Sequence, residues 1–159
     1  MGLIADKLAT ETIKKKLKEK GKISVWKFLA YDGEKLVSPY VSHNSPNWMK
    51  PGVIHSDRAE VLKKYKDRKG QPRKPTHRAP NEKRGEIQHG FHVYTTYQAA
   101  KTESSFGGYV KKAVVRFEAY KEDFIAAGTH YSTSHHVVFA KLTLTKAVLD
   151  KTLKQLRKK

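Results

Sequence analysis

The sequence contains no cysteine among its 159 residues, which excludes disulfide bonds and thiolate metal sites. It also lacks any apolar run near the ~20 residues that a membrane-spanning helix needs. The first residues show neither the apolar core of a secretory signal nor its cleavage site, and Asp6 stands where a myristoylation signal has Ser or Thr. These absences predict a cytoplasmic protein with no membrane partner.

Motifs for common cofactors are missing as well. There is no Gly-x-Gly-x-x-Gly, and "FGGYVKK" at 106–112 lacks the spacing and the Ser or Thr of a P-loop. His89 and His92 are three residues apart in a predicted strand, so they point to opposite faces, and no carboxylate cluster accompanies them. We therefore expect no cofactor and no metal ion.

Acidic residues are scarce: 15 Asp and Glu stand against 33 Lys and Arg, a net charge of +18. Most of the excess lies in three segments, with +4 over residues 1–22, +8 over 63–85 and +5 over 145–159. The rest of the chain has a net charge of only +1. Positive charge concentrated in segments indicates a surface that binds a polyanion.

The pattern of apolar residues predicts one α+β domain with a small, mainly antiparallel sheet and short helices. A 38% share of hydrophobic residues is enough for a modest core. The predicted elements are a helix over 3–20, a hairpin of strands 23–31 and 34–41, a helix over 56–65, a strand over 86–96, a helix over 96–102, strands over 111–120 and 132–144, and a last helix after Thr145. Residues 121–128 are expected to form a turn or one helical turn.

Three units follow from this pattern: a basic N-terminal helix in 1–22, an α+β body over 23–144, and a basic C-terminal helix in 145–159. Within the body, the four Gly and Pro residues at positions 70, 72, 75 and 80 forbid a continuous helix or a central strand. Residues 63–85 are therefore expected to form a long, extended, basic loop. The sequence leaves open whether that loop is ordered, and it does not give the oligomeric state.

Basic side chains in these segments are the candidate nucleic-acid contacts. Few aromatic residues interleave with them, which favours phosphate contacts on duplex DNA over a stacking platform for single strands or RNA. The candidates are Lys63, Lys64, Lys66, Arg68, Lys69, Arg73, Lys74, Arg78, Lys83 and Arg84 in the loop, Lys14, Lys15 and Lys16 in the N-terminal helix, and Lys154 and Arg157 in the C-terminal helix.

The histidines suggest an enzymatic alternative. Two histidines and a lysine can cleave RNA without a metal, and His92, His130 and Lys111 or Lys112 are the candidates. Strand alternation, however, places His92 opposite Phe91 and Val93, where it is expected to face solvent. A third reading is an adaptor that binds an acidic host protein through the basic segments.

The body resembles a group of small domains found largely in bacteriophage genomes. The resemblance covers residues 24–144 and rests on "YDG…SPY", a Trp followed by "KPG", "EIQHGFHVYTTYQAA", "VVRFEAYKEDFIAAG" and "HHVVFAKLTL". It implies a phage or prophage origin and a place in the cytoplasm of a bacterial host. No general activity comes with the group, so the basic segments indicate the function: nucleic-acid binding, in host takeover or counter-defence.

A second resemblance concerns "GFHVYTTYQAA", which is similar to the central block of ADP-ribosyltransferase-like folds. Those enzymes use an Arg or His on the first strand and a later Glu that polarises the ribose. The resemblance implies that Lys27 or Tyr31 and Glu118 occupy these roles, in departure from the Arg or His of the family.

Overall fold

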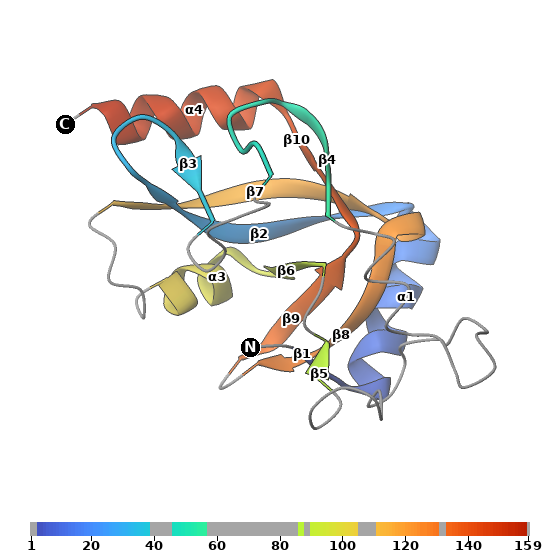
Figure 1. Ribbon diagram of the computed structural model, residues 1–159. Coiled ribbons are helices and arrows are strands. Elements are labelled where there is room, and N and C mark those ends of the chain that lie inside the picture. Colours follow the sequence, from blue (N-terminus) through green and yellow to red (C-terminus); the bar gives the residue numbers. More distant parts are fainter. Residues whose placement is uncertain are drawn as a thin grey trace.

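Residues 3–38, 46–56, 86–87, 90–104, 111–130 and 133–158 are described by the computed structural model, and they form one antiparallel sheet with three helices (Figure 1). The helix predicted over 56–65 and the basic loop 63–85 lie outside these residues, apart from Ser56. The described part of the chain confirms the α+β class and the mainly antiparallel sheet.

Ten strands form the sheet, in the order β4-β10-β7-β2-β6-β9-β8-β1-β5, with β3 paired to β2. The strands are β1 Leu3–Ala5, β2 Lys22–Tyr31, β3 Leu36–Val37, β4 Gly52–His55, β5 Glu86–Ile87, β6 Phe91–Tyr94, β7 Lys112–Tyr120, β8 Phe124–His130, β9 Thr133–Phe139 and β10 Lys141–Leu144. The helices are α1 Lys7–Lys20, α3 Tyr97–Ser104 and α4 Lys146–Arg157, and a 3-10 turn, η2, spans Lys121–Asp123. None of the helices in the described residues is both long and apolar enough to cross a bilayer.

The longest pairing joins β2 and β7, from Lys22 opposite Tyr120 to Ala30 opposite Lys112. The alternation predicted for 111–120 is confirmed, because Val115, Phe117 and Ala119 are buried on one face while Arg116 is exposed on the other. Each face of this strand pair therefore has a different environment: one is core, and the other carries polar groups.

The core lies on the face of the sheet that includes Val115 and Phe117. Trp48, from the segment between β3 and β4, is 1% exposed and packs edge-on against Phe91 and Phe117, with ring centroids 5.5 and 5.6 Å away. Helix α1 contributes Ile13 and Leu17 to the same cluster. Figure 1 shows α1 at the β8 end of the sheet, whereas α4 runs beside β7 at the opposite end.

The N-terminus differs from the helix expected over 3–20. Leu3–Ala5 forms strand β1, which pairs with β5 and β8, and α1 begins only at Lys7. The reason is Asp6, whose side chain accepts a 3.0 Å hydrogen bond from the backbone N–H of Ala9 and so caps the helix. Gly21 ends the helix in a left-handed conformation with φ of 77°, as predicted.

Two further corrections lie between residues 121 and 144. Only 121–123 form the expected helical turn, and 124–130 form strand β8. The strand predicted over 132–144 is two strands that bend at Ala140, whose N–H donates a 2.7 Å bond to the carbonyl of Asp123. After this bend, β10 pairs with β4 and β7, whereas β9 pairs with β6 and β8. The contact that causes the bend is long-range, so local propensity does not reveal it.

The hairpin after residue 31 is confirmed, although its connection is longer than two residues. Tyr31 pairs with Leu36, and Asp32–Lys35 form the link. The Asp32 carboxylate accepts hydrogen bonds from the N–H groups of Lys35 and Glu34, and these bonds lower the pKa of Asp32. Strand β4 is an element that the sequence analysis did not predict, and it lies just before the helix expected over 56–65.

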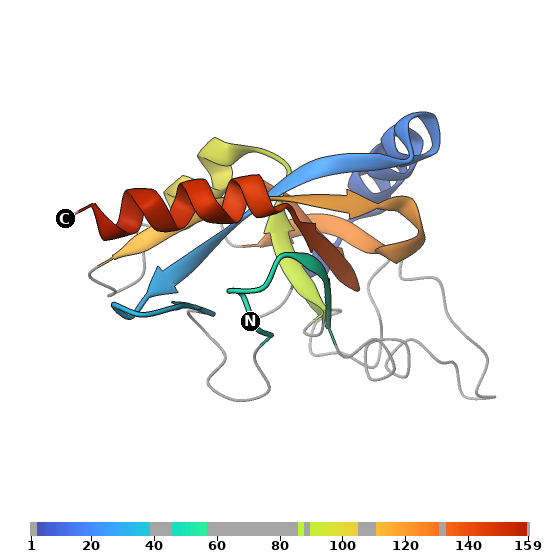
Figure 2. The same ribbon diagram turned by 90° about the horizontal axis from the view of Figure 1, so that it is seen from above.

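Both predicted helix caps after residue 90 are confirmed. Thr145 accepts a 3.3 Å bond from the N–H of Val148 at the start of α4, and Thr96 accepts a 3.1 Å bond from Ala99 at the start of α3. In the view from above, α4 lies alongside β7 over most of its length (Figure 2). This placement makes α4 a wall next to the polar face of β7.

Gly90 is expected to tolerate no side chain. Its φ is +93°, and a Cβ there would lie 2.7 Å from Cγ1 of Val138. We expect Gly90→Ala to lower the free energy of unfolding by about 1–2 kcal/mol, from backbone strain and this contact. Urea denaturation measures the change, and Gly33→Ala is the control for the φ effect alone, because Gly33 has a φ of +99° but no atom near its Cβ position. Equal losses in the two variants would contradict the steric part of this argument.

Candidate nucleic-acid interface

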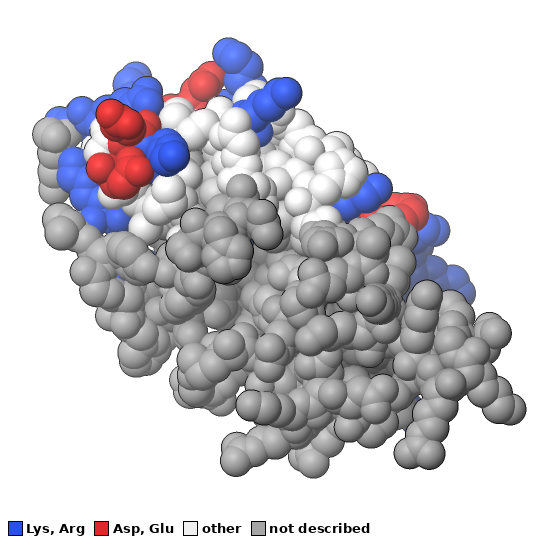
Figure 3. Space-filling model, viewed as in Figure 1, with Lys and Arg blue, Asp and Glu red and all other residues white. Residues whose placement is uncertain are grey.

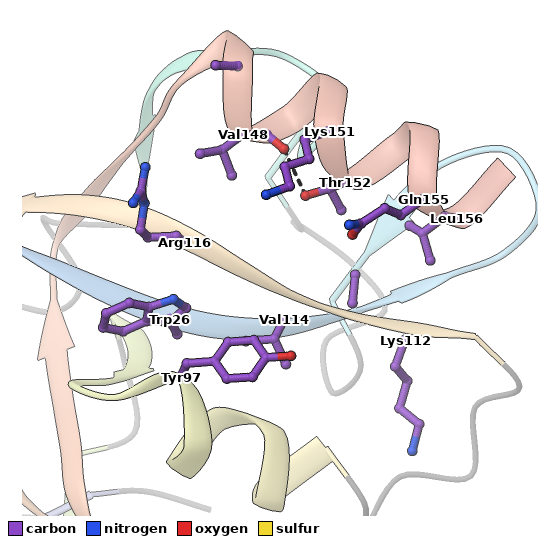
Figure 4. Close-up of a pocket in the computed structure, with 12 residues that line it drawn as sticks. Trp26, Tyr97, Lys112, Val114, Arg116, Val148, Lys151, Thr152, Gln155 and Leu156 are labelled. Carbon is purple, nitrogen blue, oxygen red and sulfur yellow. Dashed lines mark hydrogen bonds between the residues drawn. The ribbon is translucent and has the colours of Figure 1, made fainter. Parts of the chain in front are cut away.

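A groove of about 720 Å³ lies between α4 and α3, over the polar face of β7 and β2 (Figure 4). Ligand sites in proteins commonly enclose about 300–1,000 Å³, so the groove is of the size of a small-molecule or nucleotide site. Its lining residues are Trp26, Tyr97, Lys112, Ala113, Val114, Arg116, Ala147, Val148, Lys151, Thr152, Gln155 and Leu156.

Among the described residues, three cations and no carboxylate line this groove. Arg116 and Lys112 come from β7, and Lys151 comes from α4. Arg116 and Lys151 form no ion pair with any carboxylate in the described part of the chain. The described lining therefore carries a net positive charge, which favours an anionic ligand.

Aromatic and amide groups complete the lining. Tyr97, the first residue of α3, is 49% exposed and lies on the α3 side, next to Trp26 in Figure 4. Trp26 stands directly opposite Arg116 in the β2–β7 register, so the two share a face of the sheet. Gln155 from α4 is exposed and offers both a donor and an acceptor.

Charge counting missed most of this groove, because its residues come from four elements. Lys112 was a candidate only for the ribonuclease reading, and Arg116, Lys151 and Tyr97 were not singled out. A signal was present in "KKAVVRFEAY", where the face opposite the core carries Lys112, Val114 and Arg116. Only the tertiary fold shows that α3 and α4 flank that face.

The predicted helix lysines lie apart from the groove. On α1, Lys15 and Lys16 are exposed, and Lys14 is 3.9 Å from the carboxylate of Glu11. Helix α1 packs against β8, so its lysines form a separate basic surface. Figure 3 shows lysine and arginine side chains interspersed with fewer acidic ones along the upper edge of the described surface.

The two predicted residues of α4 differ from each other. Lys154 is exposed, whereas Arg157 donates hydrogen bonds of 3.4 Å to the Tyr31 hydroxyl and to the Glu34 carbonyl. Arg157 therefore ties α4 to the β2–β3 hairpin. The ten basic candidates in 63–85 lie outside the described residues.

The histidines are arranged differently from the ribonuclease expectation. His92 does lie on the face opposite Phe91 and Val93, but it is partly buried and meets His136, with Nδ1 3.2 Å from Nε2. His136 is 2% exposed and stacks on Tyr94 with a centroid distance of 5.1 Å. The prediction of a solvent-facing His92 was wrong, because β9 brings a second imidazole against it.

His92 and His130 are not brought together by the sheet. Along β9, Val138 pairs with His92 and Thr133 pairs with His130. Five residues of strand separate these positions by roughly 16 Å. His135 and His136 point to opposite faces as predicted, since His135 is exposed and its Nδ1 is 3.4 Å from the Thr95 hydroxyl.

The two lysines considered for the ribonuclease site, Lys111 and Lys112, also point in different directions. Lys112 lines the groove, whereas the Lys111 ammonium donates a 3.3 Å bond to the carbonyl of Leu156 and lies 5.9 Å from the Tyr31 ring centroid. The candidate constellation of His92, His130 and a lysine is thus not assembled in the described backbone.

The residues suggested by the ADP-ribosyltransferase resemblance lie on different faces. Lys27 belongs to the core-facing row of β2, while Glu118 belongs to the polar row of β7. Glu118 accepts a 3.0 Å hydrogen bond from Lys22, which raises the pKa of Lys22. Lys27 donates a 3.1 Å bond to the carbonyl of His92, and burial lowers its pKa to about 8.

The described residues contain no group of three or more His, Cys, Asp or Glu side chains arranged to hold a metal ion. Comparison of the chain with protein-family models, with curated proteins and with solved structures finds no match in any of the three. The site is therefore argued from its own residues.

Proposed function

We propose that this protein binds nucleic acid, chiefly through contacts with phosphates. The observation that carries the proposal is the groove between α3 and α4, whose described lining includes the cations Lys112, Arg116 and Lys151 and no carboxylate. The basic segments 1–22, 63–85 and 145–159 support it, because they concentrate the charge outside a nearly neutral body. Duplex DNA is the substrate that these segments favour, since backbone contacts need no access to the bases.

The biological setting follows from the resemblance to phage domains. A phage or prophage origin places the protein in the cytoplasm of a bacterial host, where a polycation that binds DNA interferes with host chromosome functions or with host defences. This role rests on the resemblance and on the charge distribution together.

The proposal is tested by fluorescence anisotropy with labelled duplex DNA across a salt series. Wild type is expected to bind at physiological salt, with log K falling steeply against log salt, by ~0.9 for each neutralised phosphate. A variant lacking 63–85 is expected to give a flatter slope. Absence of binding at physiological salt, to duplex DNA and to single-stranded RNA alike, would overturn the proposal. Capture of an acidic protein from nuclease-treated lysate would then support the adaptor reading.

The contribution of the groove is tested by removing two of its charges. The double variant Arg116→Gln/Lys151→Gln is expected to reduce the salt slope by about 2, because each cation that contacts a phosphate releases about one counterion. The matched control is Lys50→Gln/Lys121→Gln, which removes the same charge from two exposed lysines outside the three basic segments. Equal effects of the two double variants would show that the groove has no specific part in binding.

A further inference from the structure

One wall of the groove carries an aromatic side chain that the core does not use. Tyr97 is among the few large hydrophobic residues that are exposed in the described part of the chain, at 49%. Its ring lies beside Trp26 and Val114 over the strands, as Figure 4 shows. An exposed aromatic ring in a positively charged groove is the arrangement that binds bases by stacking.

The cations are spaced along the groove rather than gathered at one point. Lys112 and Arg116 are four residues apart on the same face of β7, which corresponds to roughly 13 Å of strand. Lys151 projects from α4 on the opposite side to Tyr97 (Figure 4). Such spacing suits successive phosphates of one extended strand better than a single isolated anion.

The size of the groove limits what can enter. At about 720 Å³, its interior accommodates one or two nucleotide units, so a double helix can bring phosphates to the exposed Arg116 and Lys151 but no paired base to Tyr97. Gln155 on the α4 wall can pair with the edge of a base, because its amide both donates and accepts. The Watson–Crick edge of a base becomes available to such a group only when the base is unpaired.

We infer that the groove between α3 and α4 binds an unpaired segment of nucleic acid, with a base stacked on Tyr97 and the adjoining phosphates on Arg116, Lys112 and Lys151. This inference rests on the proposed function and specifies its ligand: phosphates of the duplex contact the basic segments and the exposed groove cations Arg116 and Lys151, and the unpaired strand next to the duplex enters the groove. The two contributions to binding are separable, because a fully paired substrate offers no free base to stack on Tyr97.

The test compares a blunt DNA duplex with the same duplex carrying a short unpaired extension, at one salt concentration. Wild type is expected to bind the extended duplex more tightly. Tyr97→Leu is expected to weaken binding of the extended duplex at least about fivefold, and so to remove most of its preference over the blunt duplex. Tyr97→Phe keeps the aromatic face and is expected to restore the wild-type preference.

Tyr120→Leu is the matched control. Tyr120 is also an exposed tyrosine, at 36%, but it lies at the other end of β7, with the Lys22 ammonium 5.9 Å from its ring centroid. Its substitution is expected to leave the preference for the extended duplex intact. Equal affinity of wild type for blunt and extended duplexes, or equal effects of the two tyrosine variants, would overturn the inference while leaving the proposed function standing. Absence of binding to either DNA would overturn the proposed function itself.

A second readout follows from the two tryptophans. Trp26 lines the groove, whereas Trp48 is 1% exposed in the core. Addition of the extended duplex is expected to quench part of the tryptophan fluorescence, and Trp26→Phe is expected to abolish that change. Quenching that persists in Trp26→Phe would contradict binding in the groove.

Discussion

Replacing Trp48 with alanine is expected to lower the free energy of unfolding by about 3–5 kcal/mol. The indole is 1% exposed and fills the space between Phe91 on β6 and Phe117 on β7. Its removal leaves a cavity and also loses two edge-to-face ring contacts. Because Trp48 lies in the segment between β3 and β4, it fixes that irregular segment to the centre of the sheet. Urea denaturation followed by circular dichroism measures the loss.

Two other variants separate packing from hydrogen bonding at this position. The indole N–H of Trp48 has no hydrogen-bond partner among the described residues, so Trp48→Phe removes a buried polar atom as well as volume. We expect Trp48→Phe to cost clearly less than Trp48→Ala. The surface control Val53→Ala, at a residue that is 57% exposed, is expected to change stability by less than about 0.5 kcal/mol. A loss for Trp48→Ala as small as that of the surface control would contradict the packing argument.

The core and the groove lie on opposite faces of the same two strands. Phe117 points to Trp48, and its neighbour Arg116 points into the groove, because successive residues of a strand face opposite ways. The long β2–β7 pairing therefore supports the groove from behind. Binding residues mounted on a regular strand are held more rigidly than residues on a loop, and this preorganisation favours affinity.

Local chemistry explains which parts of the fold the sequence predicts. The strand over 112–120 alternates between apolar and polar residues, and Thr145 and Gly21 are standard helix ends, so each is recognisable within a few residues. The break at Ala140 depends on a hydrogen bond to Asp123, and strand β1 depends on pairing with β8. These features arise from contacts between distant segments, which a local pattern does not contain.

The candidate site likewise combines features that a local sequence pattern predicts with features that depend on contacts between distant segments. Counting charges finds basic segments, because each is a run of neighbours in the sequence. The groove combines Trp26, Tyr97, Arg116 and Lys151 from four elements, so its positive lining arises only from how these elements pack. The contact between His92 and His136 is likewise a product of the β6–β9 register.

Lys27→Met is expected to raise the free energy of unfolding at pH 7 by about 2 kcal/mol. Lys27 lies in the core-facing row of β2, between Val25 and Leu29, and its ammonium has one hydrogen-bond partner, the carbonyl of His92. Burial lowers the pKa of Lys27 from 10.5 to about 8, so the folded protein binds this proton less tightly than the unfolded chain does. The free-energy change expected here is smaller than the one that corresponds to the full pKa shift, because the Lys27 side chain is only partly buried.

The sign of the pH dependence follows from this shift. Below pH 8 the lysine is protonated in both states, and the folded state carries the whole cost of the buried charge. Between pH 8 and pH 10.5 the folded protein has released the proton while the unfolded chain still holds it, so the stability of wild type rises with pH through this window. Lys27→Met lacks this titration, and the stability difference between the two proteins is expected to shrink across the same window. Chemical denaturation of both at a series of pH values measures it, and the other lysines cancel because both proteins share them. A stability difference that stays constant from pH 7 to pH 10.5 would contradict this prediction. It would show that burial does not destabilise the charged form of Lys27, and that water reaches its ammonium from the β6 side.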